Sequence, residues 1–301
     1  MPKTDTQVFI LTQYDMPENK RNMNAYQRIY FGAEHARVHL LMRKGCEVSE
    51  EIANRVELHR APVSNRWLFL IYSVLLAAYL RLKACKIVFT EPSGFAVVGF
   101  LAKYLYGYSW VMDVWDRPRW RTGKHEQGSK PPLSDRLVFW VMRKADKYVF
   151  SVLPQAAKDI DPPPERCRQF TNAIDMSHKA DAPPRREPDR EMHVAYARSE
   201  FSHTMGLDLL LEAAEILKKR GCSVKIDLVG RVREDAEEAI SKHTAGDMFI
   251  LHGFIEESRV EFFRKIHVGL VPYRNYEDLK YIFPIKVIEH LSQGNPVIAS
   301  D

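Results

Sequence analysis

Residues 281–301 read YIFPIKVIEHLSQGNPVIASD, and this stretch indicates both the fold and a candidate site. Pro284 suits the first turn of a helix, where a backbone N–H has no helical partner. Gly294 predicts a left-handed cap at the end of that helix. Residues 297–299, Val-Ile-Ala, then predict a strand that is buried on both faces. The helix is expected to bury an apolar face formed by Ile285, Ile288 and Leu291.

Two charged residues of this helix, Lys286 and Glu289, are three positions apart and therefore share a face. A carboxylate near the start of a helix, beside a strand end of an open α/β sheet, is well placed to bind ribose hydroxyls, because nucleotides bind in such crevices. The alternative is an ordinary Lys–Glu pair on the surface, which is common on helices. Both interpretations stay open on spacing alone.

The rest of the chain alternates strands and helices, which predicts parallel sheets built from βαβ units. Apolar runs predict strands at 8–11, 86–90 and 110–114, and again at 193–197, 224–229 and 268–272. The region 161–192 is rich in proline and charge, as in a linker. We therefore predict an α/β protein with two doubly wound domains. Their limits are 1–175 and 192–301, and residues 176–191 form the linker.

The composition is that of a soluble globular protein, with 46% apolar and 28% charged residues in a chain of 301. Its net charge of +5 suits an anionic substrate or a membrane surface and does not require nucleic acid. The four cysteines are scattered, which argues against a disulfide framework or a zinc site and for a reducing compartment. The N-terminus runs directly into a strand, so we expect no signal peptide and a cytoplasmic protein.

The pattern Pro284-x-Lys286-x-x-Glu289, followed by Gly294 and the strand to Ser300, resembles the nucleotide-sugar signature of retaining glycosyltransferases with the GT-B fold. The resemblance is greatest to glycosyltransferase family 4. It implies two Rossmann-like domains facing a cleft, with Glu289 on the donor ribose. It also implies a second domain that is incomplete here, because the family fold continues further. Tyr281 stands where the family often carries another glutamate, which leaves the contact to the transferred sugar unassigned, and Tyr281 or its neighbours are candidates for that contact.

The resemblance also implies a site for the donor diphosphate. In the family, an arginine and a lysine after the first strand of the second domain bind this group. Arg198 matches the arginine, whereas Met205 stands in place of the lysine, and we expect Lys286 to supply the missing charge. Gly230 and Gly253 fall at predicted strand ends, where the backbone passes close to a nucleotide.

The loop at 115–125 is a candidate for acceptor binding. It follows a predicted parallel strand and would face the crevice. Its arginines could bind an acceptor phosphate, or they could form an exposed loop without a ligand. Single-stranded nucleic acid is not expected, because no RNA-binding motif accompanies the loop. Trp115 replaces a family histidine, so no catalytic residue is assigned. The acceptor-side candidates are Asp116, Arg117, Arg119 and Arg121.

The most apolar segment, residues 67–80, has three interpretations: a buried core helix, a helix at a membrane interface, and a spanning helix. Fourteen residues are too few for a comfortable span. Basic residues at 66, 81, 83 and 86 flank the segment, which favours contact with the inner face of a membrane if the helix is interfacial. Peripheral membrane contact through 66–86 matters because many resembling enzymes use lipid-linked acceptors.

The resemblance implies a retaining hexosyltransferase of polysaccharide biosynthesis that uses a nucleoside-diphosphate sugar and a glycan or lipid-linked acceptor. No Asp-x-Asp motif occurs where a donor-site metal would bind, so we expect no metal or other cofactor. Two alternatives remain. One is a nucleotide-sugar epimerase on the same fold. The other is a non-catalytic GT-B partner subunit, which the departures at Trp115 and Met205 favour.

Overall fold

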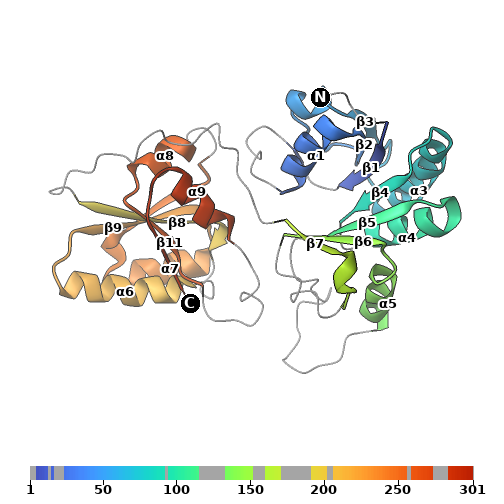
Figure 1. Ribbon diagram of the computed structural model, residues 1–301. Coiled ribbons are helices and arrows are strands. Elements are labelled where there is room, and N and C mark those ends of the chain that lie inside the picture. Colours follow the sequence, from blue (N-terminus) through green and yellow to red (C-terminus); the bar gives the residue numbers. More distant parts are fainter. Residues whose placement is uncertain are drawn as a thin grey trace. The chain divides into compact units, whose positions relative to one another are not determined.

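The computed structural model describes residues 5–12, 15–16, 24–91, 94–114, 133–151, 160–170, 191–201, 206–255, 259–273 and 284–300. The chain divides into two compact units (Figure 1). The described residues of the first unit lie between 5 and 170, and those of the second between 191 and 300. Tyr281 and the acceptor-side candidates of the loop 115–125 lie outside the described residues.

The first unit contains a seven-stranded sheet in the order β3-β2-β1-β4-β5-β6-β7, and each neighbouring pair is parallel. The order reverses direction between β1 and β4, which is the switch point where ligands bind in open α/β sheets. The strands are β1 (Gln7–Thr12), β2 (Arg37–Met42), β3 (Glu57–Arg60), β4 (Ile87–Thr90), β5 (Ser109–Val114), β6 (Lys147–Phe150) and β7 (Cys167–Gln169).

Alternation along the strands of this sheet supplies two cores. In β1, Phe9 and Leu11 belong to the core that includes residues of α3, α4 and α5, whereas Ile10 belongs to the core with α1 and α2. Trp110 of β5 packs against Gly99 of α4 and donates from Nε1 to Thr90 Oγ1 at 2.8 Å. The helices are α1 (Asn24–His35), α2 (Glu50–Ala53), α3 (Arg66–Leu82), α4 (Phe95–Tyr106) and α5 (Leu133–Met142), with a short 3-10 helix at Pro164–Arg166.

The second unit contains a five-stranded sheet in the order β10-β9-β8-β11-β12, again with parallel pairs (Figure 1). Its switch point lies between β8 and β11. The strands are β8 (Met192–Phe201), β9 (Val224–Val232), β10 (Phe249–Gly253), β11 (Val268–Val271) and β12 (Val297–Ala299). The helices are α6 (Asp208–Lys219), α7 (Glu234–Lys242), α8 (Arg259–Lys265) and α9 (Ile285–Ser292), with a 3-10 helix at Gly246–Met248.

Both sheets confirm the predicted α/β class with parallel strands, and Gly294 has the left-handed conformation expected of a cap, with φ of +73°. Two predictions for the last stretch are wrong. Leu291 is 56% exposed, and the buried residues of α9 are Glu289 and His290 instead. Ile298 is 63% exposed, because β12 is the last strand in the order of the described sheet and is covered less than a central strand.

The apolar segment at 67–80 forms most of α3, which is apolar on two sides. Its buried side faces the core and contains Phe69, Ser73, Leu76, Ala77 and Leu80. Its other side is exposed and contains Trp67, Leu68, Ile71, Leu75, Tyr79 and Leu82. A core helix therefore carries a second apolar face that the described residues leave exposed. None of the helices in the described ranges is long and apolar enough to cross a membrane.

Candidate functional site

Arg198 lies in the carboxyl-terminal half of β8, near the switch point of the second sheet, and not after the strand as predicted, because β8 continues to Phe201. Its guanidinium carbon is 5.9 Å from the ring centre of Tyr196 and 5.8 Å from that of Tyr273, which follows β11. Arg198 Nη1 donates to the Tyr196 hydroxyl oxygen at 2.8 Å. Burial raises the pKa of Tyr196 to about 12, so the neutral phenol accepts this bond. Two aromatic rings thus position the guanidinium at the edge where ligands bind.

A second donor of Arg198 remains for a ligand. Its Nε is buried and has no hydrogen-bond partner within the part of the chain that the structure describes. A buried donor without a partner costs about 1–3 kcal/mol, so such a group needs an explanation. A phosphate oxygen would satisfy it with a charge-assisted bond.

A bulge between β8 and β9 sets the position of Arg198. Ala197 pairs with Val229 and Glu200 pairs with Arg231, so positions 198 and 199 both stand opposite Gly230. Such a two-against-one bulge redirects a side chain. Gly230 has φ of +135°, and a Cβ there would overlap the carbonyl oxygen of Arg198. The predicted position of Gly230 at a strand end is therefore wrong. It lies within β9, and what approaches it is the backbone of Arg198.

Two other glycines of this unit have positive φ near the carboxyl edge. Gly253 ends β10 with φ of +64°, and a Cβ there would meet no atom among the described residues within 4 Å. Gly206 precedes α6 with φ of +82°, and its backbone lies against the carbonyl of Pro272. The sequence pattern predicts Gly253 in the site but not Gly206, although a glycine directly before a strongly periodic helix is a detectable signal.

Lys286 and Glu289 form an ion pair in α9, with Nζ and Oε2 separated by 2.9 Å. Glu289 is 5% exposed, so the alternative of an ordinary surface pair is wrong. Because α9 connects the parallel strands β11 and β12, its first turn lies at the carboxyl edge of the sheet. A buried carboxylate is tolerated when a cation compensates it, and Lys286 supplies that charge.

The first unit contains a polar cluster that sequence analysis missed. Arg28 of α1 pairs with Asp113 of β5 and donates from Nη2 to Ser151 Oγ at 2.6 Å. Burial lowers the pKa of Arg28 to about 10, which still leaves it charged. Glu91, directly after β4, is buried, and burial raises the pKa of its carboxyl to about 8 against an opposing hydrogen bond from Thr12.

This cluster lies at the switch point of the first sheet, between the carboxyl ends of β1 and β4. A small pocket opens there, and its lining consists of Ile10, Leu11, Thr12, Ala25, Arg28, Ile29, Phe89, Glu91 and Asp113. The available sequence signal was a polar residue at the end of one strand, Thr12 of β1, and directly after the other, Glu91 after β4, but the burial of Glu91 depends on packing that the local sequence does not encode.

Comparison with known proteins bears on both units. Residues 193–301 match the family model described as glycosyl transferases group 1, and this range contains Arg198, Lys286 and Glu289. The structure is similar to sucrose-phosphate synthase from Thermosynechococcus elongatus, with a TM-score of 0.71 and 17% identity over 98% of this chain and 81% of that one. The fold is that of the GT-B glycosyltransferases.

Two further GT-B structures cover 98% of the chain. The lipopolysaccharide outer core galactosyltransferase WaaB, in its apo form, has a TM-score of 0.65 and 12% identity, with 81% of that chain covered. TarM from S. aureus, in a complex that includes UDP, has a TM-score of 0.61 and 11% identity, with 86% covered. No curated protein sequence gives a significant match. The predicted resemblance to group 1 glycosyltransferases is confirmed by the family match over residues 193–301, and the likeness in fold extends over 98% of the chain.

Proposed function

We propose that this GT-B protein is a retaining hexosyltransferase that uses a nucleoside-diphosphate sugar and a glycan or lipid-linked acceptor. The observation that carries the proposal is the buried Nε of Arg198 at the switch point of the second sheet. An unsatisfied cationic donor at this edge suits a phosphate group. The family match covers the same residues.

In this proposal the side chains of Arg198 and Lys286 together compensate the negative charge of the donor diphosphate. The carboxylate of Glu289 accepts hydrogen bonds from the ribose hydroxyls while it keeps its ion pair with Lys286. The leaving nucleoside diphosphate gains negative charge as the glycosidic bond breaks, and the fixed cations stabilise that charge. We propose that these side chains suffice without a donor-site metal.

Calorimetric titration of UDP, GDP, ADP and dTDP tests the donor site. We expect one nucleotide to bind, with affinity at least about tenfold lower in Arg198→Met and Glu289→Gln, since each loses a charge-assisted bond worth about 1.5–3 kcal/mol. Arg220→Met, which removes an exposed arginine at the far end of α6, is the matched control and should bind normally. Absence of binding by a folded protein would favour the non-catalytic partner subunit.

Product analysis separates a transferase from an epimerase. With the nucleotide sugar whose nucleotide binds, release of nucleoside diphosphate should require an acceptor, and Mg²⁺ should not change the rate. Conversion of the donor to another sugar without an acceptor would instead identify an epimerase. The anomeric configuration of the product, determined by NMR, tests retention.

We further propose peripheral membrane contact through α3 and the residues that follow it. The exposed side of the helix is apolar, and Arg66, Lys83 and Lys86 place positive charge at its two ends. This combination complements an anionic bilayer surface, and the contact would place the protein at the inner face of the membrane.

Cosedimentation with vesicles tests this contact. We expect binding to vesicles containing phosphatidylglycerol and weaker binding to neutral phosphatidylcholine vesicles. Leu75→Glu, on the exposed side of α3, should reduce binding, whereas Ile216→Glu, at an exposed position of α6, should not. Equal sedimentation of Leu75→Glu and the unchanged protein would contradict the proposal.

A further inference from the structure

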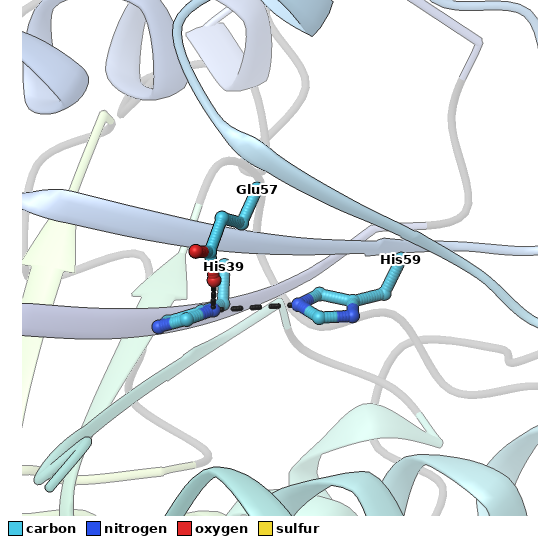
Figure 2. Close-up of side chains that lie close together, drawn as sticks. All are labelled: His39, Glu57 and His59. Carbon is cyan, nitrogen blue, oxygen red and sulfur yellow. Dashed lines mark hydrogen bonds and ion pairs between the residues drawn. The ribbon is translucent and has the colours of Figure 1, made fainter. Parts of the chain in front are cut away.

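Three metal-ligating side chains converge on one face of the first sheet: His39 of β2, and Glu57 and His59 of β3 (Figure 2). His39 stands directly opposite Glu57 in the parallel register, and His59 lies two positions further along β3. Because side chains alternate along a strand, positions 57 and 59 project to the same face. The cluster is thus fixed by two paired strands and not by loops.

The distances within the cluster suit a shared cation. His39 Nδ1 is 2.7 Å from Glu57 Oε2 and 3.3 Å from His59 Nε2, and all three ligand atoms lie within 4.8 Å of one another. In a tetrahedral zinc site with bonds of about 2.0–2.1 Å, the ligand atoms are roughly 3.3 Å apart. Small side-chain rotations would therefore bring all three atoms to bonding distance.

The surrounding hydrogen bonds direct lone pairs into the cluster. His39 Nε2 is 2.9 Å from the amide oxygen of Gln7, which can only accept, so this nitrogen carries the proton. In neutral His39, Nδ1 then presents a lone pair to the carboxylate oxygen of Glu57. Two acceptors at 2.7 Å require a positive charge between them. Arg37 binds the other carboxylate oxygen of Glu57 and leaves Oε2 for the cluster.

Either a proton or a metal ion could supply that charge at His39, which is 1% exposed. A metal ion would instead bind three protein atoms at once and could keep a water as its fourth ligand. Two imidazoles and one carboxylate favour Zn²⁺ and similar transition-metal ions over Mg²⁺.

We propose that His39, Glu57 and His59 bind one divalent transition-metal ion, with Zn²⁺ as the best fit. Gln7 acts as an outer partner that orients His39, in the manner typical of metal-bound imidazoles. The ion would join β3, the last strand in the described sheet order on this side, to β2. Its ligands are histidine and glutamate, so the argument against a zinc site from the scattered cysteines does not apply to it. The site also lies in the first unit, separate from the proposed donor site, for which no metal is expected. Positive charge on Arg37 and Lys83 nearby should make binding weaker than in a four-ligand structural site.

Cobalt spectroscopy on the full chain, after removal of metals with a chelator, tests this site. We expect one equivalent of Co²⁺ to produce the visible absorption of a four-coordinate ion, and Zn²⁺ to displace it. His59→Gln and Glu57→Gln should weaken binding at least about tenfold. His35→Gln, which removes an exposed histidine of α1, is the matched control and should bind like the unchanged protein.

A second readout does not depend on absorption. Zn²⁺ should raise the melting temperature of the unchanged protein and of His35→Gln, but not that of the two ligand variants. Because the Glu57 side chain is 41% exposed, whereas His39 is buried, Glu57→Gln should fold even if a variant of His39 does not. Absence of stoichiometric Co²⁺ binding, or undiminished binding by folded Glu57→Gln and His59→Gln, would overturn the proposal. Neither result depends on glycosyl transfer.

Discussion

The carbonyl oxygen of Arg198 lies against the α-carbon of Gly230, in the space that a Cβ would occupy at that position. This contact belongs to the bulge that places two residues of β8 opposite one residue of β9. The side chain proposed to bind the donor diphosphate is thus positioned by a backbone contact with a residue that has no side chain. The relationship explains why glycine is required inside a strand, where it is otherwise unfavourable.

Gly230→Ala should therefore affect stability and ligand binding together. We expect it to lower the free energy of unfolding by more than about 2 kcal/mol, because strain from a positive φ adds to an overlap with backbone. Gly221→Ala is the control, since Gly221 also has a positive φ but open space around it, and should cost about 1 kcal/mol. Urea unfolding and nucleotide titration measure both effects. Equal losses in the two variants would show that the contact with Arg198 is unimportant.

The ion pair between Lys286 and Glu289 should be coupled strongly enough to measure. Lys286→Met leaves a carboxylate buried without its cation, so it should destabilise the protein more than the double variant Lys286→Met, Glu289→Met. A double-mutant cycle from urea unfolding should give a coupling on the order of 1–3 kcal/mol. The exposed pair Lys219–Glu215 of α6 is the control, and its coupling energy should be small because solvent screens the two charges. Similar coupling in both pairs would contradict the burial of Glu289.

Glu91 should make stability depend on pH in the neutral range. Burial raises the pKa of its carboxyl from 4.5 to about 8, so between these values the unfolded chain has lost a proton that the folded protein keeps. The contribution of Glu91 to the free energy of unfolding should be greatest below pH 4.5. It should fall as the pH rises to 8, by up to about 1.4 kcal/mol per pH unit.

Urea unfolding at several pH values between 5 and 8 measures the slope. Glu91→Gln should remove this contribution, because the amide does not ionise. Glu212→Gln, at an exposed position of α6, should keep the slope of the unchanged protein. The same slope in Glu91→Gln would mean that other groups cause the pH dependence.

The two sides of α3 should respond differently to truncation. Phe69→Ala should cost about 3–5 kcal/mol, because Phe69 is 2% exposed and packs edge-to-face on Phe95. Ile71→Ala should change the free energy of unfolding by less than about 0.5 kcal/mol, because Ile71 is 59% exposed. Thermal or urea unfolding of the isolated protein in water distinguishes them. A large loss in Ile71→Ala would show that something covers this side in solution.

Features with a local cause could be predicted from the sequence. The parallel sheets follow from alternating strands and helices, and the buried face of α6 follows from the spacing of Leu210, Leu211 and Ala214. The cap at Gly294 follows from the need for a residue that tolerates positive φ. In each case the deciding residues are neighbours in the chain.

Features that depend on strand register could not be predicted in this way. The bulge at Arg198 requires the pairing of β8 with β9, and the cluster of His39 with Glu57 requires that of β2 with β3. The exposure of Ile298 was missed because a short apolar run has the same pattern in a central strand and in one at the end of a sheet. Burial of Glu91 likewise results from residues that are distant in the chain.

The position of β12 has a consequence for handling this chain. Within the described sheet, β12 pairs with β11, and its other side offers backbone donors and acceptors beside the exposed Ile298. An apolar strand edge of this kind can template the addition of a strand from another molecule. If no further segment covers this edge, it can seed aggregation at high concentration, and a charged residue in place of Ile298 would suppress that route without touching Arg198 or Glu289.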